Sequence, residues 1–140
     1  MITMLRERNP DSKITSVDLV QRHETSTHSF LPGDLTDASA ILKVFRESGA
    51  TTVFHVAAGL LSSPKPILEK VNIGGTRNII DACLACRVKK LVYTSSSGVV
   101  FDGNQLINVD ERLPAVEQTS FDDYMWSKVS SLVARHVKSI

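Results

Sequence analysis

Short apolar runs alternate with helically spaced apolar positions along this chain. Residues 13–20 and the start of residues 28–37 are strand-like, and the second run leads into a turn at Pro32 and Gly33. Residues 51–59 and 89–101 are nearly continuous apolar runs, which is typical of strands covered on both faces. This alternation predicts βα units arranged around a parallel sheet.

Three segments have the apolar spacing of helices. Residues 38–48 follow several candidate helix-capping residues: Asp34, Thr36 and Asp37. Residues 66–87 form a long helix candidate with a proline at its start, and a third helix should follow the polar loop 102–120. Gly74 and Gly75 interrupt the long helix candidate, although glycine costs roughly 1 kcal/mol relative to alanine there. We therefore expect them to allow close helix packing, room for a cofactor, or both.

Composition narrows the class of protein. The chain has 140 residues, 42% of them hydrophobic, and a formal net charge of +1, so it holds one domain at most. It lacks the basic excess of a nucleic-acid-binding protein and has no apolar run of membrane-spanning length. Cys83 and Cys86 have no second pair and no histidines at ligand spacing, so we expect no metal site. A redox pair is conceivable, but we favour buried thiols in a reducing, intracellular compartment.

Candidate ligand-binding residues follow four successive predicted strands. Asp18 ends the first, Asp34 and Leu35 follow the second, Ala57–Gly59 follow the third, and the hydroxyls of residues 94–97 follow the fourth. Each group by itself could be a solvated strand end, a turn or a packing contact. Because open α/β sheets bind ligands outside the carboxyl ends of their strands, the shared position predicts a ligand site there.

Tyr124 and Lys128 stand four positions apart, on one face of the last predicted helix. That spacing is a short motif that chance can produce, and the pair could simply cover a helix surface. An ammonium group one turn away favours phenolate over phenol, and a strand-end serine can hydrogen-bond a substrate oxygen. Together they could exchange a proton with a carbinol or carbonyl while hydride passes to or from nicotinamide. The three residue types, in this chain order, favour dehydrogenase chemistry.

Several stretches, in order through nearly the whole chain, resemble a known family: VDL (17–19), GDLTD (33–37), VFHVAA (53–58), VNIGGTRNIIDAC (71–83), KKLVYTSSSGVVFDGNQLINVDE (89–111) and YMWSK (124–128). The family is the 3β-hydroxysteroid dehydrogenases of the extended short-chain dehydrogenases/reductases, and the likeness is greatest to its fungal sterol-4α-carboxylate 3-dehydrogenase (decarboxylating) branch.

The resemblance implies a role for each of these residues. Tyr124 would be the catalytic acid/base, Lys128 its ribose-binding partner and Ser96 the substrate-orienting hydroxyl, although Ser95 and Ser97 leave that last assignment open by one position. Asp18 at the adenosine ribose would favour NAD over NADP, since it would repel a 2′-phosphate. The other implied cofactor-binding residues are Asp34, Leu35, Ala57, Ala58, Gly59, Asn72 and Thr94.

The reaction implied for the sterol branch is oxidation of a 3β-hydroxyl to a ketone, after which the β-keto acid loses carbon dioxide from C4. A nucleotide-sugar epimerase or an aldehyde/flavonoid reductase of the same superfamily is an alternative, and so is a non-catalytic binding module. We expect a sterol or steroid substrate, no nucleic-acid partner and no transmembrane segment in this chain. A homodimer is compatible with the long helices, and the expected location is the cytoplasm or the cytoplasmic face of the endoplasmic reticulum.

One feature of the family is missing from the sequence. No G-x-x-G-x-x-G turn, which receives the pyrophosphate, is present, and residues 1–10 resemble the end of the helix that follows such a turn. We therefore expect residues 1–140 to be a partial NAD-binding Rossmann domain: a doubly wound parallel sheet that lacks its first strand, is truncated after the catalytic helix and has no complete substrate domain. Strands at 13–20 and 52–58 should flank a gap with open edges, with low stability and weak or no NAD binding.

Overall fold

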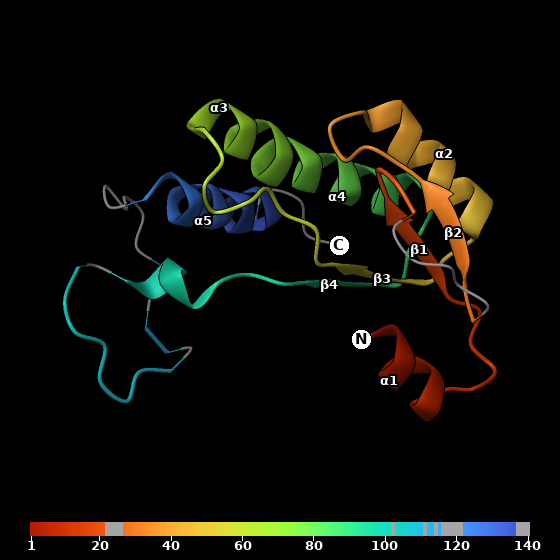
Figure 1. Ribbon diagram of the computed structural model, residues 1–140, viewed down its shortest axis with the longest axis horizontal. Coiled ribbons are helices and arrows are strands. Elements are labelled where there is room, and N and C mark those ends of the chain that lie inside the picture. The colour runs from red at the N-terminus through yellow and green to blue at the C-terminus, as the bar shows by residue number, and fades with distance from the viewer. Residues whose placement is uncertain (22–26, 102, 111, 114, 116–121, 137–140) are drawn as a thin grey trace.

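The computed structural model describes residues 1–21, 27–101, 103–110, 112–113, 115 and 122–136 (Figure 1). The elements run in the order α1 (Ile2–Arg8), β1 (Thr15–Asp18), β2 (Ser29–Pro32), α2 (Ala38–Ser48), β3 (Thr52–His55), α3 (Lys65–Leu68), the π-helical η1 (Glu69–Gly74), α4 (Gly75–Ala85), β4 (Lys90–Tyr93), the 3-10 helix η2 (Ser97–Val100) and α5 (Asp123–His136). This order confirms the α/β class.

The four strands form two separate parallel pairs. In one, Thr15 of β1 lies opposite Ser29 of β2; in the other, Thr52 of β3 lies opposite Lys90 of β4. Within the described residues β1 and β3 are not paired with each other, which agrees with the gap expected between them. Figure 1 shows the long helices α2, α4 and α5 lying along one side of the strands.

The core lies between these helices and the strands. The side chains of Ile41, Val44 and Phe45 in α2 are buried against those of Ile79, Ala82 and Cys83 in α4, and Leu31, Val53 and Leu91 of the strands pack on them. Asp37 caps α2 by accepting hydrogen bonds from the backbone N–H groups of Ser39 and Ala40. The hydrogen bond that its carboxyl accepts from the Ser39 hydroxyl, together with these backbone bonds, holds the pKa of Asp37 below the ordinary value. The predicted helix over residues 38–48 is therefore confirmed, with its cap.

The prediction that residues 51–59 and 89–101 are strands covered on both faces is wrong. Each strand is only four residues long, and Phe54, Val56 and Val92 are 40%, 47% and 48% exposed. Side chains alternate across a strand, so His55 and Tyr93 point to the helices while these three lie on a face that the described residues leave open. Periodicity could not distinguish these cases, because apolar side chains occupy both faces: Val53 and Leu91 pack on the core, whereas Phe54 and Val92 are exposed.

The long helix predicted over residues 66–87 is a helical rod in three pieces that ends at Ala85, with the π-helical η1 in its middle. Gly75 allows close packing, because a Cβ there would lie 2.9 Å from the Leu35 Cβ. Gly74 has no such neighbour: a Cβ would meet only the Glu69 carbonyl oxygen, at 3.8 Å. Close packing therefore accounts for Gly75 alone, and room for a cofactor stays a prediction for Gly74.

Much of the predicted polar loop, at residues 102, 111, 114 and 116–120, lies outside the described residues, and so do residue 121 and residues 137–140. None of the helices described is both long enough and apolar enough to cross a lipid bilayer.

Candidate functional site

Ser96 and Tyr124, which are far apart in the sequence, line one pocket of about 430 Å³. We call this space the Ser96–Tyr124 pocket. Ser97 and Gly98 add to its wall, and the rest of the lining is apolar: Leu61, Phe101, Leu106 and Met125. A volume in this range is typical of small-molecule sites, and the pocket combines the hydroxyl-bearing residues Ser96, Ser97 and Tyr124 with an apolar surface.

Packing of η2 on α5 brings Ser96 and Tyr124 to this pocket. A Cβ on Gly98 would lie 3.0 Å from the Cγ and Cε of Met125, so glycine allows η2 to approach the helix that carries Tyr124. At the start of α5, the Asp122 carboxylate accepts a hydrogen bond from the Tyr124 backbone N–H at 2.6 Å. Local turn chemistry thus sets where Tyr124 enters the helix.

The three successive serines after β4 have different surroundings. Ser96 Oγ accepts a hydrogen bond from the Gly98 N–H at 3.2 Å and caps η2. Ser96 and Ser97 both line the pocket, whereas the Ser95 hydroxyl is buried and has no hydrogen-bond partner among the described residues. The open choice among the three serines therefore narrows to Ser96 or Ser97 as the residue that a ligand in this pocket could reach.

Lys128 lies one turn after Tyr124, and its ammonium group points to the end of β4. Its Nζ donates a hydrogen bond to the Thr94 carbonyl oxygen at 2.8 Å and lies 4.5 Å from the centroid of the Tyr93 ring. Lys128 is only 3% exposed and is not part of the lining of the Ser96–Tyr124 pocket. Its predicted role as a ribose-binding residue stays a prediction.

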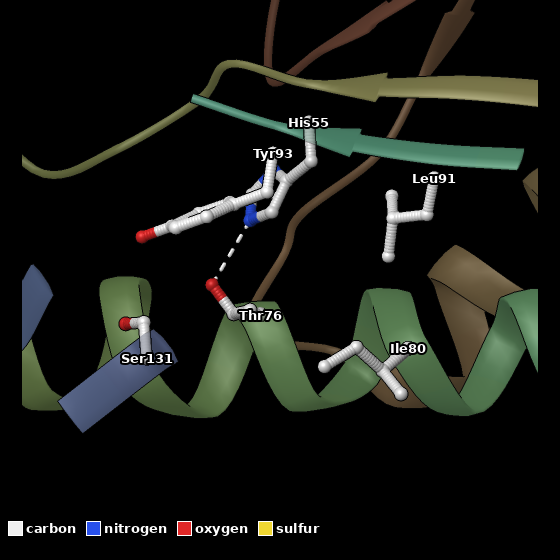
Figure 2. Close-up of a pocket in the computed structure, with 6 residues that line it drawn as sticks. All are labelled: His55, Thr76, Ile80, Leu91, Tyr93 and Ser131. Atoms are coloured by element: carbon white, nitrogen blue, oxygen red, sulfur yellow. Dashed lines mark hydrogen bonds between the residues drawn. The ribbon is translucent and has the colours of Figure 1, made fainter. Parts of the chain in front are cut away.

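Behind Lys128 lies a buried histidine. His55 Nε2 is 3.0 Å from the Thr76 hydroxyl, and the His55 and Tyr93 rings are tilted by 41° with centroids 5.3 Å apart (Figure 2). Burial, together with the positive charge of Lys128, lowers the pKa of His55 to about 4. The imidazole is therefore neutral at physiological pH and adds no second cation beside the lysine.

Asn72 connects the loop after β3 to α5. Its Oδ1 accepts a hydrogen bond from the Gly59 N–H at 2.8 Å, and its Nδ2 donates to the Ser127 hydroxyl at 2.8 Å. Ser127 donates to the Tyr124 carbonyl at 2.7 Å, and Ser131 donates to the Asn72 carbonyl at 2.8 Å. The Asn72 side chain, predicted to contact a cofactor, is thus buried and bonded at both ends within the protein.

Sequence reasoning missed Ser127 and Ser131. The signal present in the sequence is a pair of small hydroxyl residues at positions i and i+4 of the last helix, a spacing that puts both on one face. Both are fully buried in the structure.

The remaining predicted cofactor residues lie, as expected, at carboxyl ends of strands, but on two different sheets. After β1 and β2, Asp18 accepts a hydrogen bond from the Leu19 N–H, Asp34 accepts one from the Thr36 N–H, and the Leu35 carbonyl accepts one from the Asn78 amide. Beyond β3, Ala57 and Ala58 are exposed. Their roles stay predictions.

The fold defines the class of protein. The structure of the Bordetella bronchiseptica enzyme WbmG in complex with NAD is similar, with a TM-score of 0.81 over 99% of this chain and 46% of that chain at 18% identity. The Thermus thermophilus UDP-glucose 4-epimerase complex with NAD has a TM-score of 0.78 over 97% of this chain and 45% of that chain at 25% identity. The chain therefore has a Rossmann-like α/β fold of the short-chain dehydrogenase/reductase type and covers about half of it.

The sequence identifies the family within this class. Residues 1–133 match the 3-beta hydroxysteroid dehydrogenase/isomerase family, and the chain belongs to it. A sterol-4-alpha-carboxylate 3-dehydrogenase (decarboxylating) of Schizosaccharomyces pombe is 40% identical over an alignment of 133 residues, which covers 91% of this chain and 38% of the relative. Human short-chain dehydrogenase/reductase family 42E member 1 is 34% identical over 112 residues, or 77% of this chain and 28% of the relative. The chain thus spans well under half the length of these relatives.

Proposed function

We propose that this chain carries the acid–base and cofactor-binding residues of an NAD-dependent oxidoreductase that oxidises the 3β-hydroxyl of a sterol or steroid of the 4α-carboxy type. We further propose that residues 1–140 are a partial NAD-binding domain. The observation that carries the proposal is that Ser96 and Tyr124 line one pocket. A hydroxyl able to orient a substrate oxygen and a phenol able to exchange its proton thereby border the same space.

The side chains supply the steps of an alcohol oxidation. Tyr124 takes the proton of the 3β-hydroxyl as the carbon–oxygen bond becomes a carbonyl. Because Ser96 Oγ accepts the Gly98 N–H, its own proton remains available for donation to the substrate oxygen. Lys128, one turn after Tyr124, would hold the ribose of the cofactor. Bound NAD supplies the acceptor for the hydride that leaves C3.

Decarboxylation follows from the product of that oxidation. The new 3-ketone is β to the 4α-carboxylate, so the bond between C4 and the carboxylate can break with release of carbon dioxide. Its electron pair passes into the enolate of the ketone, which then takes up a proton.

The strand-end residues fit part of an NAD molecule. Asp18 is exposed at the end of β1, where a carboxylate can accept hydrogen bonds from ribose hydroxyls and would repel a 2′-phosphate. Ala57 and Ala58 are exposed after β3 and leave the backbone open to a flat ligand. The 140-residue sequence has no Gly-rich turn for the pyrophosphate, so we expect weak binding of NAD and weaker binding of NADP.

The pocket lining supports a sterol over a nucleotide sugar. Four of its side chains are large and apolar: Leu61, Phe101, Leu106 and Met125. Covering an apolar ring system with such side chains is favourable by roughly 25 cal/mol per Å², whereas a sugar would leave hydroxyl groups against them without partners.

The test incubates the purified chain at millimolar NAD with a 4α-carboxysterol, a steroid 3β-alcohol or a UDP-sugar, and it follows NADH formation and, for the UDP-sugar, the epimer by chromatography. Millimolar cofactor compensates for weak binding. We expect this partial domain to be weakly active or inactive. Turnover that it shows should occur with the sterol or steroid, should be lost in Tyr124→Phe, and should decrease clearly in Ser96→Ala compared with the neighbouring Ser97→Ala. Calorimetry with NAD on the same variants separates a loss of chemistry from a loss of binding.

Two results would overturn this function. Turnover or epimerisation of the UDP-sugar alone assigns the chain to the epimerase alternative. Saturable binding of NAD without turnover of any substrate would make a non-catalytic binding module the better account.

A further inference from the structure

We propose that the face of the Tyr93 ring and the Thr94 carbonyl form a seat that fixes the ammonium group of Lys128. Tyr93 would then be a positioning residue for Lys128. The structural part of this inference stands on the contacts alone, and only its consequence for turnover rests on the proposed function.

Burial of Lys128 calls for a compensating partner, since a fully buried lysine is rare unless it is paired. Its side chain is 3% exposed. The two ion pairs among the described residues join Lys65 to Asp123 and Arg112 to Asp110, so neither involves Lys128. The partners that the structure offers instead are the Thr94 carbonyl at 2.8 Å and the Tyr93 ring at 4.5 Å.

Both partners come from adjacent residues at the end of β4, so the strand holds the ammonium group from two directions. A carbonyl oxygen accepts one of the three N–H donors, and an aromatic face attracts the cation through its quadrupole, an effect that strengthens when water is excluded. A ring and a carbonyl carry no net negative charge, so they hold the lysine without cancelling its charge.

The Tyr93 ring also has an aromatic neighbour, His55. Figure 2 shows the ring lying beside that of His55, whose Nε2 meets the Thr76 hydroxyl. The cavity that borders these residues has a volume of only about 10 Å³, which is at the lower limit for one water molecule. This layer therefore has no room for a ligand and acts as a support.

The ring of Tyr93, and not its hydroxyl, is the part that this seat needs. The Tyr93 hydroxyl is buried and has no hydrogen-bond partner among the described residues. Phenylalanine keeps the aromatic face and removes an unsatisfied polar group, whereas leucine has a similar apolar character but no aromatic face. The pair of substitutions Tyr93→Phe and Tyr93→Leu therefore separates the proposed role from simple core packing.

The test is NMR of the purified chain labelled with carbon-13 at the lysine ε-carbons, since a methylene group over a ring face is shifted upfield by the ring current. We expect two upfield-shifted lysines: Lys128, and Lys65, whose Nζ lies 4.7 Å from the Trp126 ring centroid. Lys128→Arg and Lys65→Arg assign the two signals. The Lys128 shift should persist in Tyr93→Phe and disappear in Tyr93→Leu, while the Lys65 shift stays in both and reports that α5 is still folded.

Each result decides one claim. No upfield shift for Lys128 in the unmodified chain, or its loss in Tyr93→Phe, overturns the seat whatever the activity is. If turnover is present, Tyr93→Leu should lower kcat about tenfold, whereas Tyr93→Phe should keep the kcat of the unmodified chain. An unchanged kcat in Tyr93→Leu would show that Tyr93 does not position Lys128 for catalysis. A shifted Lys128 in a chain that binds NAD but turns over no substrate upholds the seat and counts against the proposed function alone.

Discussion

The side-chain amide of Asn72 donates a hydrogen bond to the Ser127 hydroxyl at 2.8 Å, although 55 positions separate the two residues in the chain. Asn72 also holds the Gly59 N–H in the loop after β3. Through these two bonds one buried side chain connects a loop at a strand end to the helix that carries Tyr124 and Lys128.

We predict that Asn72→Ala destabilises the protein by about 1–3 kcal/mol, because it removes the acceptor of the partly buried Gly59 N–H and the amide that donates to the buried Ser127 hydroxyl. Ser127→Ala should cost about 1–2 kcal/mol for the same reason. Urea unfolding of the two single variants and the double variant measures the coupling between them, which we expect to be at least 0.5 kcal/mol. Ser130→Ala, a partly buried neighbour on the same helix, is the control and should change stability by less than about 0.5 kcal/mol. Strictly additive effects would contradict a direct bond.

The adjacent glycines of the long helical rod should respond oppositely to alanine. At Gly75 the new Cβ would lie 2.9 Å from the Leu35 Cβ, an atom fixed to the backbone, so Gly75→Ala should destabilise the fold by about 1–3 kcal/mol. At Gly74 the space is open, and Gly74→Ala should stabilise it by roughly 0.5–1 kcal/mol through helix propensity. Thermal melts of the two variants make this comparison, and equal shifts in Tm would refute it.

Stability should decrease with acid because of His55. Its pKa is lowered to about 4 in the fold from about 6.5 when unfolded, so the unfolded state binds the proton first. The contribution of the neutral imidazole is complete above about pH 6.5 and is lost as the pH falls toward 4, by about 3 kcal/mol in total. Free energies of unfolding measured across this range should fall less steeply for His55→Gln than for the unmodified chain. Parallel curves would mean that His55 is not buried as a neutral group.

The two cysteines should differ in reactivity. Cys83 is 1% exposed, and burial, with the neighbouring Cys86, raises its pKa to about 11; the thiolate is the reactive form. Iodoacetamide at neutral pH should therefore label the partly exposed Cys86 and spare Cys83, as read by mass spectrometry. Cys86→Ser should leave the native chain unlabelled until denaturant is added, and rapid labelling of that variant would contradict the buried position of Cys83.

Local patterns predicted several parts of the structure correctly. A cap of α2 among Asp34, Thr36 and Asp37, and the buried face of residues 41–45, could be read from the sequence because capping and helical spacing depend only on residues within one or two turns. The structure selected Asp37 from the three candidate caps. The parallel strands and the placement of Asp18, Ala57 and Ala58 at strand ends follow from the βα alternation. Even the unpaired positions of β1 and β3 could be anticipated, because the family resemblance implied a strand between them.

Other features could not be predicted, because they depend on contacts between distant segments. Exposure of Phe54 and Val92 is decided by which elements cover the sheet, and no local pattern contains that information. The π-helical turn at Glu69–Gly74 and the burial of the Asn72 side chain likewise depend on what the long rod packs against.

The sequence alone determined the types of elements, their order, and the family with its Ser96, Tyr124 and Lys128. Only the tertiary structure decided that Ser96 and Ser97, but not Ser95, line the pocket beside Tyr124, that Lys128 lies on the Tyr93 ring, and that Asn72 bonds to Ser127. The reason is physical. Propensity and periodicity act over a few residues, whereas a hydrogen bond such as that from Lys128 to Thr94 joins groups 34 positions apart and exists only once the helices have packed on the strands.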